Sequence, residues 1–136
     1  MRIDEVISIS KRKRNTVNET VFSDTTGIDE YDRMHNDPSY ASQCGFSTNV
    51  IQMTPAEYVR CCAEGKGSSI LDTVDDRIGT GKVSKYAMLM ASGEKSPMPL
   101  LLYGLDEFQQ EGLHRALAAQ ELGYTTVPVL VVTEIE

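Results

Sequence analysis

The fold is indicated most clearly by residues 110–119, which read QEGLHRALAA. A polar run at residues 107–110 can form a short strand, Gly112 opens a turn, and a helix is predicted over residues 113–122, ending before Gly123. The first backbone N–H groups of a helix have no partner inside it, and the helix dipole makes that end attract anions. The sequence therefore predicts a strand, a glycine turn and a helix that together form an anion site.

Two positive side chains follow the glycine. His114 and Arg115 fall in the first turn of the predicted helix, where a positive charge costs roughly 0.3–1 kcal/mol unless an anion is bound. Arg115 could grip a phosphate with two hydrogen bonds, His114 could donate one, and Gly112 lets a ligand approach the backbone. The predicted phosphate-binding residues are Gly112, Leu113, His114 and Arg115. The alternative is that His114 and Arg115 are structural residues of a degenerate site.

Glu111, directly before the glycine, has two interpretations. It could act as a general base or help to hold a metal–nucleotide complex. It could instead be a structural carboxylate that pairs with a neighbouring arginine. Glu111 and His114 are therefore the candidate catalytic residues.

Two apolar runs frame this unit. Pro97 and Pro99 lead into a predicted strand at residues 100–103, and a second strand is predicted at residues 127–132. Pro128 lies in the second run and favours an edge strand or the first strand position, because proline cannot donate a ladder hydrogen bond.

Upstream, a strand is expected at residues 50–53 and a helix directly after it. Thr54 can cap this helix, Pro55 suits its first position, and Glu57 completes a capping box. We expect the helix to end at Gly65, followed by a loop over residues 65–69. A further helix is expected over residues 84–93, from the helical spacing of its apolar residues.

Residues 1–45 are predicted to be an N-terminal arm or a partly ordered extension, and residues 46–136 the folded domain. A short strand is expected at residues 6–9. The basic run at residues 11–14, KRKR, is either a solvated arm or a weak contact for nucleic acid or an acidic partner.

Composition excludes several classes of protein. The 136 residues carry a net charge of −7, which opposes sequence-independent binding to nucleic acid. The N-terminus lacks a signal-peptide core, and no apolar run is long enough to span a bilayer. Three cysteines without a C-x-x-C pair indicate reduced thiols. We therefore expect a cytoplasmic protein without a membrane partner.

Three further motifs suggest a ligand or metal site. Residues 79–82, GTGK, resemble part of a P-loop, but Asp76 and Val83 stand where that motif needs a glycine and a hydroxyl residue. Lys82 could still reach a phosphate. Asp72, Asp75 and Asp76 form an acidic cluster that could bind Mg²⁺, with solvated surface as the alternative. His35 and Asp37 could join a metal site, but the presence of only two histidines in the chain argues against a zinc centre. Cys61 and Cys62 are expected to be one buried and one half-buried helix position.

Taken together, these residues resemble the ParB/sulfiredoxin superfamily. Its members share a Gly-x-His-Arg or Gly-Glu-Arg-Arg turn, an alanine-rich helix, a glycine and a Val/Ile-Pro-Val strand. The matching segments here are residues 111–119 (EGLHRALAA), 122–123 (LG) and 127–129 (VPV), after the proline-led strand 97–101 (PMPLL). The resemblance implies an α/β (α+β) fold, with a small mixed sheet and packed helices.

The resemblance also implies a function. In the family the turn equivalent to Gly112–Arg115 grips nucleotide phosphates, so the implied cofactor is ATP or CTP with Mg²⁺, and the implied activity is that of an NTPase, kinase or nuclease. Leu113 stands where sulfiredoxin needs its cysteine, which argues against sulfinic acid repair. Stand-alone versions of the unit imply a bacterial, phage or mobile-element origin. The alternative is a non-catalytic binding or inhibitory module of phage origin that engages a host protein.

Overall fold

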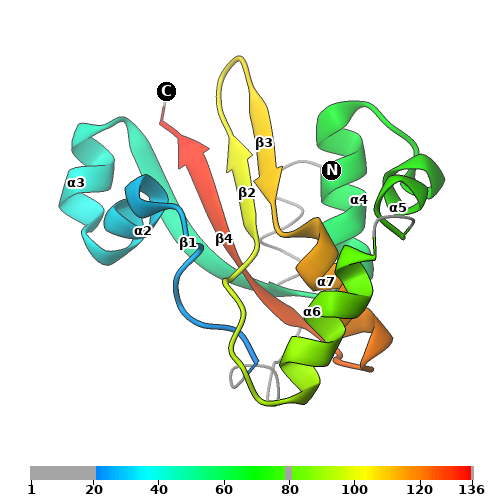
Figure 1. Cartoon of the computed structure of the whole chain (residues 1–136). Coiled ribbons are helices and arrows are strands. Elements are labelled where there is room, and N and C mark those ends of the chain that lie inside the picture. Colours follow the sequence, from blue (N-terminus) through cyan, green and yellow to red (C-terminus); the bar gives the residue numbers. More distant parts are fainter. Residues whose placement is uncertain (1–20, 79–80, 136) are drawn as a thin grey trace.

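The computed structural model describes residues 21–78 and 81–135, with the side chains of residues 75–78 left out. Four strands form one mixed sheet in the order β1-β4-β2-β3 (Figure 1). The strands are β1 (Phe46–Met53), β2 (Leu100–Tyr103), β3 (Phe108–Glu111) and β4 (Val127–Glu134). β4 is antiparallel to β1 and parallel to β2, while β2 and β3 form an antiparallel hairpin. The predicted α+β fold with a mixed sheet is confirmed.

Helices lie on both faces of this sheet (Figure 1). They are α2 (Asp29–Asn36), α3 (Pro38–Gln43), α4 (Pro55–Lys66), α5 (Ile70–Ile78), α6 (Lys82–Ala91) and α7 (Leu113–Glu121). Leu101 of β2 packs in the core with α4, α6 and α7, whereas Leu100 and Leu102 pack on the other face with α2 and α3. Since both faces are covered, β2 and β4 are apolar at nearly every position instead of alternating.

The described part of the expected N-terminal extension, residues 21–45, is folded against the sheet. Met34 of α2 and Ala41 of α3 are each 1% exposed and share a core with Leu130. The Asp32 carboxylate accepts hydrogen bonds from the Thr26 amide at 2.6 Å and the Thr26 hydroxyl at 2.8 Å. Residues 1–20, with the strand expected at 6–9 and the basic run at 11–14, lie outside the described residues.

The capping box of α4 is confirmed, but the predicted end of the helix is wrong. The Glu57 amide donates to Thr54 Oγ1 at 3.0 Å, and the Thr54 amide donates to Glu57 Oε1 at 2.8 Å. The helix passes through Gly65 and ends beyond it, with Gly67 in the left-handed conformation at φ 70°. Gly65 is a packing residue, because a Cβ there would lie 2.5 Å from the Phe108 ring.

The expected position of Pro128 is also wrong. Pro128 is the second residue of β4, and β4 lies between β1 and β2. The Leu130 amide points toward β2 and donates to the Pro99 carbonyl at 2.9 Å. The Pro128 nitrogen, two residues earlier, also points toward β2. At that position β4 has no partner in β2, because the pairing of the two strands begins with Leu100 and Leu130. Its missing N–H therefore breaks no ladder bond.

Two smaller expectations need correction. Residues 70–78 form α5, which the sequence did not predict, and Asp72 lies exposed on it. Cys61 and Cys62 are both buried, with 1% and 0% exposure. No helix in the described ranges has the length and apolar character needed to cross a bilayer.

Candidate functional site

The turn between β3 and α7 needs glycine for two reasons. Gly112 has φ 116°, a left-handed conformation that side-chain-bearing residues rarely adopt. A Cβ at this position would also lie 2.8 Å from the Pro99 Cα atom. Ala116 donates to the Gly112 carbonyl at 2.9 Å, which closes the first turn of α7, and no side chain of Gly112 can cap the remaining amides. The predicted arrangement of strand, glycine turn and helix is therefore present.

Tyr58 of α4 holds the strand end that leads into this turn. Its hydroxyl lies 3.0 Å from the Leu100 carbonyl and 3.0 Å from the Glu111 carbonyl, and its one proton is shared between these two acceptors. The side chain is fully buried, and burial raises its pKa well above the usual value, so the phenol remains a donor at neutral pH. Tyr58 could not be assigned this role from the sequence, because its partners are more than forty residues away in the chain.

Arg115 lies beside Gly112 and is almost fully buried, at 6% exposure. Its Nε donates to the Pro97 carbonyl at 2.8 Å, and Nη1 lies 3.7 Å from Glu111 Oε1. Its Nη2 is buried and has no hydrogen-bond partner within residues 21–78 and 81–135. One edge of the guanidinium is thus used by the fold, while Nη2 is buried without a hydrogen-bond partner among the described residues.

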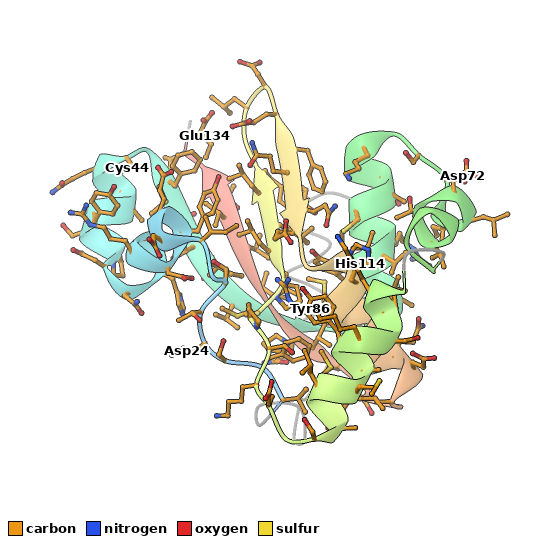
Figure 2. All side chains as sticks on the ribbon, viewed as in Figure 1. Asp24, Cys44, Asp72, Tyr86, His114 and Glu134 are labelled. Carbon is orange, nitrogen blue, oxygen red and sulfur yellow. The ribbon has the colours of Figure 1, made fainter. Side chains whose placement is uncertain are left out.

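A cavity of about 290 Å³ opens in front of the turn. Figure 2 shows His114 of α7 and Tyr86 of α6 near one another at this cavity. Its lining residues are Lys82, Lys85 and Tyr86 from α6, and Gln110, Glu111, Gly112, Leu113, His114 and Arg115 from the turn. The structure thus brings together all the predicted phosphate-binding residues, both candidate catalytic residues and Lys82.

The cavity is locally positive on an acidic chain. Two lysines and one arginine line it together with a single carboxylate, that of Glu111, whereas the whole chain carries −7. The Glu111 side chain is 60% exposed, so it faces solvent as well as Arg115. The Glu111 carboxylate is thus placed both beside the Arg115 guanidinium and at the cavity wall.

Three residues of the cavity, Lys85, Tyr86 and Gln110, were not predicted from the sequence. Lys82, Lys85 and Tyr86 follow the three- and four-residue spacing of one helix face, so this signal was present once α6 was known to begin at Lys82. Gln110 carried no such signal. Its Oε1 is buried and makes no hydrogen bond to any part of the chain that the structure describes.

The remaining candidates lie away from the cavity or outside the described residues. His35 and Asp37 belong to α2 and to the cap of α3, on the opposite face of the sheet. Gly79 and Thr80 are outside the described residues. Within those residues, no group of three His, Cys, Asp or Glu side chains could hold a metal ion.

Cys61 and Cys62 lie in the core, Cys44 is exposed at the end of α3, and none of them lines the cavity. Burial raises the pKa of the Cys61 thiol, which therefore stays protonated and unreactive at neutral pH.

The site is thus a helix N-terminus, a buried arginine and two lysines around one cavity. No protein-family model, no curated protein and no solved structure matches the chain.

Proposed function

We propose that this chain binds a phosphate-bearing ligand, in the first place a nucleotide, at the turn Gly112–Arg115. The observation that carries the proposal is Nη2 of Arg115, a buried charged donor that no described group of the chain satisfies. A buried N–H without a partner costs roughly 1–3 kcal/mol. A phosphoryl oxygen bound there would remove this cost and would also accept from the first amides of α7.

The charges around the turn support the same ligand. Lys82 and Lys85 of α6 line the same cavity as the turn, so an anion in the cavity meets positive groups from two elements. Mg²⁺ binds proteins through one or two carboxylates together with substrate phosphates. Glu111 is the carboxylate at this cavity, and we propose ATP or CTP with Mg²⁺ as the bound species.

The family proposal is a protein of the ParB/sulfiredoxin type. It is supported by the chain order of β2, β3, the glycine turn, α7 and β4, which carries the motifs of that family in sequence. Leu113 in place of the sulfiredoxin cysteine keeps sulfinic acid repair out of the proposal. A phage or mobile-element origin in a bacterial cytoplasm is part of this proposal.

Turnover is the second stage of the proposal. Glu111 would act as the general base or hold Mg²⁺, and His114 would donate to the transferring phosphoryl group. Release of inorganic phosphate from ATP or CTP, followed in Glu111→Gln and His114→Asn, measures these roles. Unchanged nucleotide affinity with loss of release would assign the residue to catalysis.

Calorimetric titration with magnesium ATP, CTP and GTP tests the binding proposal. We expect at least one nucleotide to bind, and Arg115→Ala to weaken it by roughly tenfold or more, as expected for loss of a charge-assisted hydrogen bond. Because Arg115 is buried, Arg115→Lys and a thermal melt accompany it. Arg60→Ala, an exposed arginine of α4 outside the cavity, is the matched control and should bind as the wild type does. Absence of binding by every nucleotide would overturn the proposal and leave the protein-binding module.

A further inference from the structure

We infer that β1 pairs antiparallel with β1 of a second copy of this chain, so that two chains share one continuous sheet. The inference concerns an edge of the sheet and does not depend on the proposed function. Three features of β1 carry it: the backbone groups that point outward, the lack of charge along the strand, and one exposed valine.

The first feature is a row of backbone groups that points away from the sheet. β1 is an end strand of the sheet (Figure 1), and its only strand partner among the described residues is β4. The Ile135 amide donates to the Gly45 carbonyl at 2.7 Å, which fixes the side of the β1 segment that faces β4. Because backbone N–H and C=O groups alternate in direction along a strand, those of Thr48 and Val50 point outward. A further strand would meet these groups as hydrogen-bond partners.

The second feature is the lack of charge along this edge. Residues 38–56 contain no Asp, Glu, Lys or Arg, although 24% of the residues in the chain are charged. Natural edge strands are commonly protected by charged side chains, by proline or by short length. The other edge strand, β3, has four residues, follows Asp106 and Glu107, and ends at Glu111. β1 has eight residues with neither charge nor proline, so it lacks the protection that β3 has.

The charge of the chain identifies the partner as a second copy. Each chain carries −7, so two copies repel one another over most of their surfaces, and residues 38–56 are where they can approach with least repulsion. Pairing about a two-fold axis places the same strand on both sides. With the axis at Asn49, Thr48 of each copy lies opposite Val50 of the other, and no like charges meet. A basic peptide, which an acidic chain otherwise attracts, finds no carboxylate along this edge.

The third feature is the exposure of Val50. Its side chain is 41% exposed, although Leu130, its partner on β4, is fully buried. Among the residues of the four strands, all of which the structure describes, Val50 is the one exposed large apolar side chain. Opposed β-branched side chains, such as Thr48 and Val50 of two copies, pack well on a sheet surface. Pairing would therefore remove apolar surface from water and satisfy the outward backbone groups together.

Sedimentation equilibrium of the full chain, from about 10 μM to about 1 mM, tests the inference. A single strand pair is a small interface, so we expect a dimer with a Kd on the order of 0.1 mM. Added salt should tighten the dimer, because it screens the repulsion between two acidic chains. A chain that stays monomeric at about 1 mM would overturn the inference.

Hydrogen exchange of the backbone amides locates the contact. The Thr48 and Val50 amides should exchange several-fold more slowly at high protein concentration than at low, whereas the Gln109 amide of β3 should exchange at the same rate. Slow exchange at Thr48 and Val50 in a monomer, independent of concentration, would mean that the edge is covered within one chain. That outcome would also overturn the inference.

Variants of β1 test the same contact. Thr48→Pro removes an outward N–H and spares the bonds to β4, and Val50→Lys puts a charge on the edge. Each should raise the Kd of the dimer by roughly tenfold or more. Gln109→Lys, the same change of charge at an exposed position of β3, should leave the Kd unchanged. Thermal melts check folding, and Val50→Lys decides alone if Thr48→Pro does not fold. A dimer that persists in the folded variants would overturn the assignment to β1.

Discussion

At the residue scale, Gly112 is the position on which the site depends. Its left-handed backbone and the close approach of Pro99 are separate constraints, and any side chain violates both. The glycine turn can therefore be predicted from the sequence, but its contact with Pro99 cannot. Pro99 lies thirteen residues earlier in the chain, and no local sequence pattern indicates that it packs against Gly112.

The two constraints can be measured separately with a pair of glycine variants. Gly112→Ala should lower the free energy of unfolding by more than about 2 kcal/mol, from left-handed strain plus the collision with Pro99. Gly123→Ala has the same kind of backbone at φ 86° but open space around the new Cβ, and should cost only about 1 kcal/mol. Urea denaturation gives both values. Equal losses would mean that the Pro99 contact adds nothing.

At the element scale, the sequence predicts a helix boundary correctly where the interactions that set the boundary lie within one turn of the helix. The capping box at Thr54 and Glu57 predicted the start of α4 correctly, because all its atoms lie within one turn. The predicted end of α4 at Gly65 was wrong. Glycine is needed there because the Phe108 ring of β3 packs against it, and not because the helix stops. α2 was missed because its single buried residue, Met34, leaves almost no apolar pattern in an acidic stretch.

The role of Gly65 has a clear experimental signature. A glycine-to-alanine change inside a helix normally stabilises by up to about 1 kcal/mol. Gly65→Ala should instead destabilise, because its Cβ would lie 2.5 Å from the Phe108 ring. In the background Phe108→Ala the same change should become neutral or stabilising. A double-mutant cycle of thermal melts reports the coupling, and additive effects would contradict the contact.

At the scale of the whole molecule, two buried tyrosines make the free energy of unfolding fall as the pH rises into the alkaline range. Burial raises the pKa of Tyr58 and of Tyr103 above the usual value of about 10. Above that pH the unfolded chain loses these protons before the folded chain does, so stability is full below about pH 10 and falls as the pH rises beyond it. Each such tyrosine costs about 1 kcal/mol per pH unit in that window.

Tyr58→Phe tests this linkage against the wild type. The variant should be less stable at pH 8, since the Leu100 and Glu111 carbonyls lose their donor. The difference should shrink between pH 10 and 11, because phenylalanine has no proton to lose. Urea denaturation at each pH gives both curves. A difference that is constant with pH would show that Tyr58 titrates alike in the folded and unfolded chains.

The central claim is that an anion binds in front of Gly112 at the N-terminus of α7. The most direct measurement is a titration of ¹⁵N-labelled protein with tripolyphosphate, followed by amide and arginine Nε chemical shifts. We expect the largest changes at the Leu113, His114 and Arg115 amides and at the Arg115 side chain. No change at saturating probe, or changes confined to α2 and α3 on the other face of the sheet, would contradict the account.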